Sequence, residues 1–321
     1  MKARASLPGP MPAWAEIVLM PLANILLAFI VVGVLVAVIG VDPFRALQLL
    51  AIGAVGSAES IGYTLYYTTN FIFTGLAVAV AFHAGLFNIG GEGQAYIGGL
   101  GVGLLALWFG QLPFLVVLPL AILGGAVFGA AWAFIPAWLQ ARRGSHIVIT
   151  TIMFNFIAAA LMTYLLVNVL IRPGQQSPET REFAASATMP PVHELLAAIG
   201  VTFAPTPLNL ATGLALVAAL LVWVLIWRTR WGFALRVAGR SATVATYAGI
   251  APARVTIGAM ALSGALAGCL GLNELLGSQH RILIDFPAGA GYVGIAVALM
   301  GRNHPAGIIA AAILFGALSQ G

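Results

Sequence analysis

The run Phe114–Leu139, FLVVLPLAILGGAVFGAAWAFIPAWL, holds no charged residue in 26 positions. As an α-helix it is about 39 Å long, enough to cross the roughly 30 Å hydrocarbon core of a bilayer. The whole chain shares this character: of 321 residues, 61% are hydrophobic and 7% are charged, and the mean hydropathy is +1.03. Soluble domains carry about 25% charged residues. The sequence therefore predicts an all-α polytopic membrane protein.

Eight further apolar runs, each bounded by Gly, Pro or Arg, repeat this pattern along the chain. They lie at Ile17–Ile39, Tyr66–Phe82, Gln94–Phe109, Ile147–Ile171, Leu208–Trp227, Val255–Leu276, Tyr292–Met300 and Ala306–Leu318. The first run is too long for a signal-peptide core, so we expect it to be retained. Together with an interfacial or half-crossing helix within Pro43–Gly62, these runs predict about eight to ten transmembrane helices.

The basic residues predict the orientation of the chain. With the N-terminus inside, the inner segments hold Lys2, Arg4, Arg142, Arg143, Arg228, Arg230, Arg236, Arg240, Arg254 and Arg302, and the outer segments hold Arg45, Arg172, Arg181 and Arg281. Cytoplasmic loops are enriched in Lys and Arg, so a cytoplasmic N-terminus is expected. Residues 172–207 then form an external connector, with a short helix at Val192–Ile199.

Several kinds of chemistry are excluded by what the chain lacks. Its one lysine is Lys2, so neither a phosphate-binding Walker A loop nor a lysine Schiff base can form. Its one cysteine is Cys269, and its five histidines have no metal-ligand spacing. We therefore expect no catalytic residues, no metal site and no cofactor on this chain. An intramembrane enzyme has no support, because no paired acids or His-Cys pair is present.

The inner segment 228–254 carries five arginines and no acid. Ser241 can cap a helix that Gly249 ends, and Pro252 follows. This predicts a helix of about two turns, with Val244, Tyr247 and Ala248 on one side. The segment is either a basic loop containing a little helix or a docking element that inserts into a partner and transmits force.

Residues 85–103 contain eight glycines around Asn88, Glu92 and Gln94. Glycine costs a helix interior about 1 kcal/mol relative to alanine, and a carboxylate deep in the bilayer costs at least about 2.5 kcal/mol. One hypothesis is a broken helix whose polar groups face a water-filled path. The other is a solvated cytoplasmic turn at Glu92, followed by close helix packing through Gly99 and Gly103.

Further polar residues lie within the apolar runs. Thr151 and Asn155 are four positions apart and so share a helical face, and Asn273 and Glu274 end the seventh run. Such residues either line a path or bond neighbouring helices together. Phe87-Asn88 before Gln94 and Leu272-Asn273 before Gln279 share a spacing, which points to a two-fold pseudo-repeat with the site between the halves.

Four segments carry a resemblance to a known family. Gly85–Gln94 (GLFNIGGEGQ), Thr150–Ala158 (TTIMFNFIA), Gly232–Ile250 (GFALRVAGRSATVATYAGI) and Gly294–Pro305 (GIAVALMGRNHP) are its motifs. They resemble the inner-membrane permease subunits of bacterial ABC importers, in the branched-chain amino acid, ribose and nucleoside permease superfamily. The Asn-Ile-Gly-Gly-Glu-Gly-Gln form is most similar to the nucleoside and simple-sugar branch.

The resemblance implies a single transmembrane permease domain over 1–321, a type II ABC-importer-like bundle in a bacterial inner membrane. It also implies a second permease subunit, identical or related, an extracytoplasmic substrate-binding protein, and cytoplasmic ATPase subunits that bind ATP and Mg. The expected substrate path holds Asn88, Glu92, Gln94, Thr151, Asn155 and Asn273. The expected ATPase-coupling residues are Arg236, Arg240, Ser241, Val244, Tyr247 and Gly249.

A secondary transporter of a small polar solute, driven by an ion gradient, is the alternative. Glu92 or Glu274 would then hold the proton or sodium ion, because an intramembrane carboxylate is a functional candidate by default. Such a transporter needs no ATPase. Replacing Glu92 with Gln would abolish its ion coupling.

Overall fold

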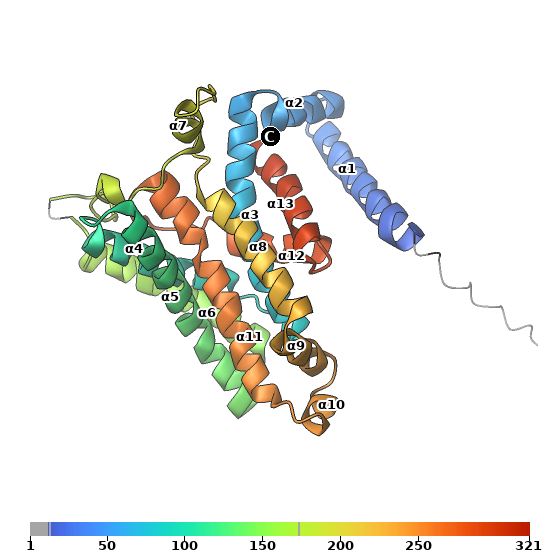
Figure 1. Ribbon diagram of the computed structural model, residues 1–321. Helices are drawn as coiled ribbons and strands as arrows, with labels where there is room; N and C mark the ends of the chain where they lie inside the picture. Colours follow the sequence, from blue (N-terminus) through green and yellow to red (C-terminus); the bar gives the residue numbers. More distant parts are fainter. Residues whose placement is uncertain (1–11, 13, 173) are drawn as a thin grey trace, which may run out of the picture. The chain divides into compact units, whose positions relative to one another are not determined.

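A computed structural model describes Pro12, residues 14–172 and residues 174–321 (Figure 1). The regular structure in these residues is helical. Backbone pairing of the β type is limited to two isolated bridges, Glu179 with Leu283 and Pro191 with Asn209. The all-α prediction is confirmed. Lys2 and Arg4 lie outside the described residues, so the orientation of the N-terminus stays a prediction.

The chain divides into two compact units between Ile52 and Gly53, and each is described by itself. In the first unit, the π-helix η1 (Ala15–Leu19) leads into α1 (Met20–Val38), and α2 (Pro43–Val55) begins there. The axes of α1 and α2 are bent by 117°. Asp42 Oδ1 accepts the Phe44 N–H at 2.9 Å and so caps the start of α2. The helix expected within Pro43–Gly62 is present and ends at Val55.

The second unit, Gly53–Gly321, contains the remaining elements. They are α3 (Ala58–His83), α4 (Gly91–Phe109), α5 (Phe114–Arg143), α6 (Ile147–Asn168), the 3₁₀ turn η2 (Ala185–Ala187), α7 (Val192–Ala197), α8 (Ala211–Arg228), α9 (Arg230–Arg240), α10 (Ala242–Tyr247), α11 (Pro252–Gly268), the π-helix η3 (Leu272–Gln279), α12 (Ala290–Met300) and α13 (Pro305–Gln320). Each of the nine apolar runs of the sequence corresponds to one helix, continued by η3 in the case of α11.

Fewer of these helices can cross a bilayer alone than the sequence predicted. Within the part of the chain that the structure describes, five are long and apolar enough: α3, α5, α6, α8, and α11 continued through η3. The bent pair α1 and α2 makes a sixth if it counts as one span. With 11 and 16 residues, α12 and α13 are shorter than the roughly 20 residues that a crossing needs. An apolar run therefore predicted a helix correctly, but not always a complete span.

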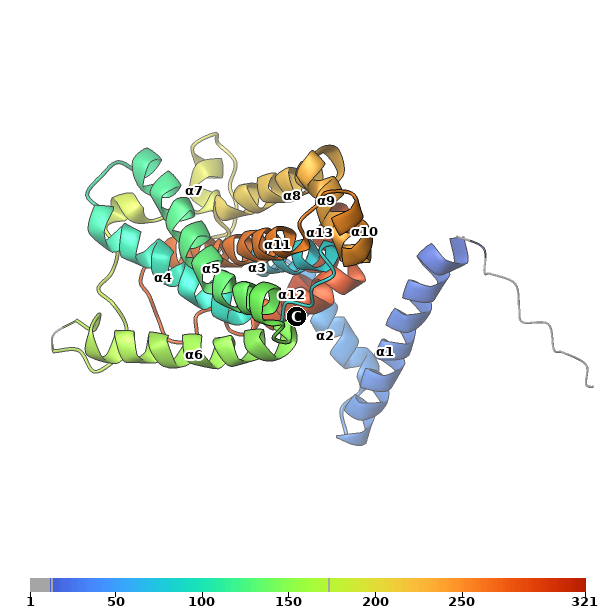
Figure 2. The same cartoon turned by 90° about the horizontal axis from the view of Figure 1, so that it is seen from below.

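Helix α3 lies at the centre of the second unit, with α8, α11, α12 and α13 against it (Figures 1 and 2). Its most apolar window is 83% buried, whereas those of α5, α6 and α8 are 28% buried and leave apolar faces for lipid. Hydropathy placed its start at Tyr66, but the helix begins at Ala58, where Ser57 Oγ accepts the Ser60 N–H at 3.0 Å. The first turns of α3 contain polar residues. Two of them, Thr64 and Thr68, donate hydrogen bonds to the carbonyl oxygens of Ala54 and Thr64.

Glycines let α4, α5 and α11 approach closely. A Cβ atom on Gly264 would overlap the carbonyl oxygen of Gly129, and one on Gly98 would overlap Gly268 Cα. Of the expected packing pair, Gly99 lies against a small residue, since a Cβ on Gly271 would come within 2.7 Å of Gly99 Cα, while a Cβ on Gly103 would meet Ile282. On the neighbouring face of α4, Gly98 and Gly101 lie against Gly268 and Gly124.

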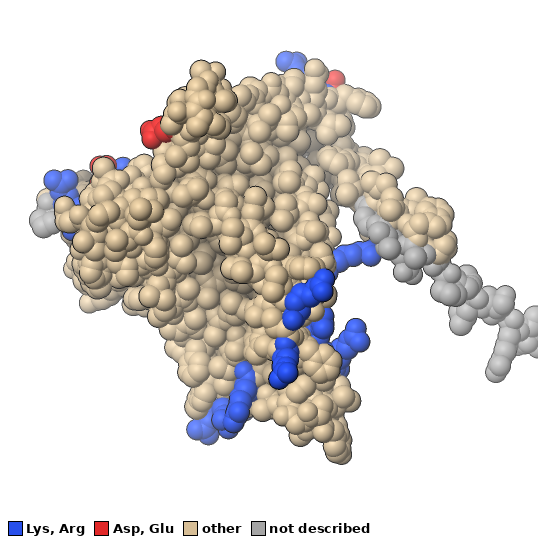
Figure 3. All heavy atoms as spheres, in the orientation of Figure 1, with Lys and Arg blue, Asp and Glu red and all other residues tan. Residues whose placement is uncertain are grey.

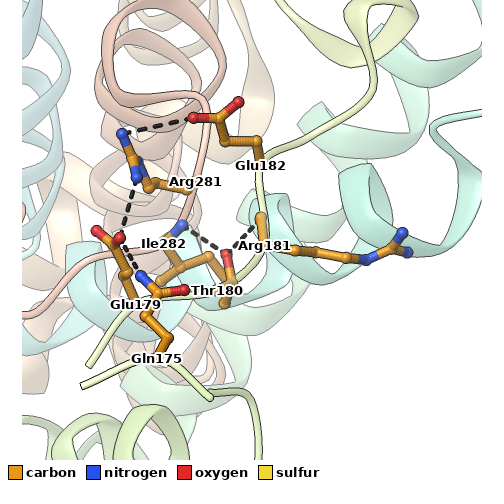
Figure 4. A network of polar contacts seen from close by, with 7 residues as sticks. All are labelled: Gln175, Glu179, Thr180, Arg181, Glu182, Arg281 and Ile282. Carbon is orange, nitrogen blue, oxygen red and sulfur yellow. Dashed lines mark hydrogen bonds and ion pairs between the residues drawn. The ribbon is translucent and has the colours of Figure 1, made fainter. Parts of the chain in front are cut away.

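The connector 172–207 is fixed to the segment around η3. The N–H groups of Thr180, Phe183 and Met189 donate to the carbonyl oxygens of Ile282, His280 and Leu276. Arg281 bonds Glu179 at 3.0 Å and lies 3.6 Å from Glu182 (Figure 4). The short helix expected at Val192–Ile199 is α7, Val192–Ala197. The connector is therefore built into the structure along much of its length.

Candidate functional site

The turn between α3 and α4 holds the first polar network. Asn88 is fully buried: its Oδ1 accepts the Gly90 N–H at 2.9 Å, and its Nδ2 donates to Gln94 Oε1 and to Ser263 Oγ, each at 2.9 Å. Ser263 Oγ donates in turn to the Ala77 carbonyl oxygen at 2.6 Å. These bonds join α3, α4 and α11, so every polar group of Asn88 and the amide of Gln94 has a partner within the chain.

Asn155 connects α6 to the same turn. Its Oδ1 accepts the Gly93 N–H at 2.9 Å, and its Nδ2 donates to the Ile89 carbonyl oxygen at 2.9 Å and to the Tyr292 hydroxyl at 3.1 Å. Thr151 is buried on the same face of α6, but its hydroxyl donates to Ile147 and Val148 of its own helix. Asn155 thus makes the contacts between elements, and Thr151 fills space beside them.

Glu92 joins the first turn of α4 to the start of α12. One carboxylate oxygen accepts the Gly289 N–H at 2.8 Å, and the other accepts the Gly291 N–H at 2.7 Å. Free N–H groups at a helix N-terminus and the helix dipole both favour a carboxylate there. Glu92 is half-buried and lies in the first turn of α4 rather than in the preceding turn, and whether it lies at the cytoplasmic face stays a prediction. The carboxylate holds two helix N-termini together.

A second polar network lies where η3 meets α3. Asn273 Nδ2 donates to the Tyr66 carbonyl oxygen at 3.1 Å and to Asn70 Oδ1 at 2.9 Å, while its Oδ1 accepts from Asn209 Nδ2 at 2.9 Å. Asn70 Nδ2 donates to Glu274 Oε1 at 2.5 Å. Of the sequence-predicted path residues, Asn88, Gln94 and Asn155 belong to the first network and Asn273 to this one, whereas Glu92 bonds to the start of α12 and Thr151 only to its own helix. Their contact with a substrate stays a prediction.

A cavity of about 750 Å³ adjoins this second network. The side chains that matter most to its chemistry are Tyr63, Tyr66, Tyr67, Glu274, Gln279 and Asp285. Sequence reasoning missed the tyrosines. Their spacing was the available signal, because positions i, i+3 and i+4 place three aromatic hydroxyl-bearing side chains on one face of a membrane helix.

The loop behind this cavity has an unusual backbone. His280, Asp285 and Ala288 have φ values of 55°, 58° and 48°, in the left-handed region that residues other than glycine rarely adopt. Asp285 and Ala288 line the cavity. Such strain concentrates at sites where function requires it.

The arginine-rich segment 228–254 forms α9 and α10. Ser241 Oγ accepts the Val244 N–H at 3.3 Å, and Gly249, with φ of +75°, ends the turn, so the predicted short helix is confirmed. Tyr247 is 89% exposed and Val244 57%, whereas Ala245 is buried. In the second unit, most exposed arginines gather towards this end, where no acid is visible (Figure 3). Arg236 and Arg240 line a nearby pocket of about 590 Å³.

Comparisons with known proteins identify similar chains. Residues 60–321 match the family model described as "Branched-chain amino acid transport system / permease component". The chain is 35% identical over 308 residues to the nucleoside ABC transporter permease protein NupB of Lactococcus lactis subsp. cremoris, covering 95% of this chain and 83% of NupB. It is 35% identical over 307 residues to the guanosine ABC transporter permease protein NupP of Bacillus subtilis, covering 94% and 85%.

A third relative comes from an archaeon. The chain is 33% identical over 312 residues to the glucose ABC transporter permease protein TsgB13 of Haloferax volcanii, covering 97% of this chain and 81% of TsgB13. No solved structure matches the chain.

Proposed function

Because the chain belongs to the family of branched-chain amino acid transport system permease components, we propose that it is the membrane subunit of an ATP-driven importer for nucleosides or simple sugars. The family match over residues 60–321 is the observation that carries this proposal. The substrate class follows the relatives, which are named for nucleosides, guanosine and glucose. The chain would work in a bacterial inner membrane, paired with a second permease subunit and served by an extracytoplasmic binding protein.

The cytoplasmic ATPase subunits would dock on α10. An aromatic side chain as exposed as Tyr247 on a short helix, at the end of the unit where the arginines gather, marks a protein contact more readily than a lipid contact. Arg240 and Ser241 precede this helix, and Gly249 follows it, so the chain presents a compact protruding element. ATP and Mg would bind to these partners and not to this chain.

Helix α11 offers a route for force from α10 to the interior. Ile250 N–H donates to the Ala245 carbonyl oxygen at 2.9 Å, which fixes α10 to the start of α11. Further along the same span, Ser263 bonds Asn88, and beyond it η3 carries Asn273 and Glu274. Because α11 and η3 form one helical span, a displacement of α10 would be transmitted through them to both polar networks. Closure of the ATPases would in this way switch the path between its inward- and outward-facing states.

The test is co-purification combined with transport. We would tag the chain, extract the complex in mild detergent and identify its partners by mass spectrometry, for the native chain and for a double variant V244D/Y247D. The expected result is an ATPase subunit with the native chain and its loss from the double variant. ATP-dependent uptake of guanosine or glucose should fall with it.

The control is I199D, which puts one of the two added carboxylates on an exposed apolar residue just beyond α7. It should retain the ATPase. If the folded native chain brings down no ATPase, or if uptake follows an ion gradient and persists without ATP, the proposal fails. The ion-driven alternative would then rest on Glu92 or Glu274.

A further inference from the structure

We infer that the cavity beside Glu274 is a nucleoside-binding subsite, in which the tyrosines of α3 hold the base and the carboxylates of Glu274 and Asp285 hold the ribose hydroxyls. This inference rests on the proposed function and names the chemistry of one site within it. The cavity volume of about 750 Å³ falls within the roughly 300–1,000 Å³ range of small-molecule sites. It is lined wholly by residues of the second unit.

Three aromatic residues of the cavity lining come from one helix. Tyr63, Tyr66 and Tyr67 lie within two turns of α3, and the rings of Tyr66 and Tyr67 are 5.4 Å apart at 65°. Edge-to-face pairs of this kind are favourable and hold each ring in place. Flat π-systems stack on such rings whatever the base, at about 1–3 kcal/mol per base in single-stranded nucleic acid complexes.

The polar side comes from η3 and the loop after it. Glu274, Ser278, Gln279 and Asp285 supply carboxylate, hydroxyl and amide groups. A carboxylate accepts hydrogen bonds only, and is therefore suited to the hydroxyl groups of a sugar. Asn70 donates to one oxygen of Glu274, and Tyr66 lies beside the same carboxylate, so its position in the cavity wall is fixed. The lining thus combines aromatic rings with hydroxyl-binding groups, the two kinds of contact that a nucleoside requires.

The same lining argues against two other classes of ligand. None of the described residues around the cavity is lysine or arginine, while two are acids. A phosphorylated ligand or the carboxylate of an amino acid would meet negative charge without a permanent cation to pair with. A free hexose carries hydroxyl groups on every side but no flat π-system. It would therefore leave the tyrosine rings without a stacking partner.

Two buried polar atoms at the cavity lack a protein partner. They are His193 Nδ1 and Thr206 Oγ1, and both residues belong to the cavity lining. Thr206 is 6% exposed. Nearly all buried polar groups in folded proteins are hydrogen-bonded, so unpaired ones at a cavity mark a place where a ligand or water completes the bonding. They extend the polar lining from η3 to the connector.

The single cysteine of the chain makes a direct test possible. In a C269A background, Q279C places a thiol at the exposed rim of the cavity. The complete transporter in membrane vesicles is treated with a membrane-impermeant maleimide, with and without guanosine, glucose or leucine. We expect saturating guanosine to slow labelling about fivefold or more, as occlusion of the thiol by a bound base predicts, and glucose and leucine to leave it unchanged.

Substitutions then identify the contacts. Y67L and Y63L should each abolish protection by guanosine, whereas Y164L, at an exposed tyrosine of α6, should keep it. E274Q should weaken protection by guanosine more than E59Q, which changes an exposed acid outside the cavity. Retention of a monodisperse complex in gel filtration shows that each variant is folded.

The subsite is disproved if guanosine gives no protection, if glucose protects as well as guanosine, or if Y63L and Y67L both leave protection intact. Uptake by the same vesicles separates this result from the proposed function. ATP-dependent uptake without protection by guanosine removes only the subsite. Absence of ATP-dependent uptake of either substrate class removes the importer, and the protection data still decide whether nucleosides bind in the cavity.

Discussion

Replacement of Asn155 should destabilise the protein most directly, because its amide bonds two groups in the glycine-rich region and the Tyr292 hydroxyl of α12. N155L removes these bonds and leaves the Gly93 N–H and the Ile89 carbonyl oxygen buried without partners. Each such group costs about 1–3 kcal/mol. We expect a clear fall in the melting temperature of the detergent-solubilised protein, measured by tryptophan fluorescence.

N168L is the matched control for this change. Asn168 ends the same helix, is exposed, and bonds only to the Tyr164 carbonyl oxygen. Its replacement should shift the melting temperature little. Equal shifts for the two variants would contradict the view that Asn155 holds α6 to the turn before α4.

Glu92 gives a second prediction at the scale of the residue. Each of its carboxylate oxygens accepts one N–H group at the start of α12. In E92Q the amide keeps one acceptor oxygen and places an NH₂ donor against the other N–H. We expect lower thermal stability, by about 1–2 kcal/mol, and slower uptake that still depends on ATP. If uptake by the native protein depends on an ion gradient and uptake by E92Q does not, the result would instead support an ion-coupling role for Glu92.

At the scale of the element, the contact between α5 and α11 depends on the absence of side chains. A Cβ on Gly264 would overlap the Gly129 carbonyl oxygen and come within 2.6 Å of Ala133 Cβ. Backbone on both sides cannot move aside cheaply, so G264A should destabilise the protein by about 1–3 kcal/mol. Thermal unfolding in detergent would measure this difference.

The control for that prediction is G213A. Gly213 lies in α8, and no atom lies within 4 Å of the position that an added Cβ would take. Alanine in a helix is favoured over glycine by about 0.5–1 kcal/mol, so this change should be neutral or stabilising. If G264A behaves like G213A, α5 and α11 do not pack as closely as the structure describes.

The whole molecule provides a test of sidedness. In a C269A background, I199C in the outer connector and T243C on α10 are both exposed single thiols. The arginines near α10 predict that this end faces the cytoplasm. An impermeant maleimide applied to intact cells should label I199C at once and T243C only after permeabilisation. Labelling of T243C in intact cells would reverse the orientation.

The local features of this protein followed from its sequence. Apolar runs predicted nine helices at their observed places, because helix formation in lipid needs only consecutive residues that bury their own backbone hydrogen bonds. Ser241 and Gly249 predicted α10 for the same reason: a cap and a left-handed turn are properties of a few neighbouring residues. The motifs around Asn88 and Arg302 were enough to indicate the family.

Only the tertiary structure decided which distant groups meet. Glu92 caps a helix that begins almost two hundred residues later, and Asn88 bonds Ser263 across a similar separation. No periodicity encodes such pairings, because they depend on how the helices pack. The same is true of the cavity, which brings the tyrosines of α3 together with acids of η3 and the following loop. Sequence determined the helices and the family, whereas packing decided the distant partners of Asn88, Asn155 and Asn273, because those partners belong to other helices.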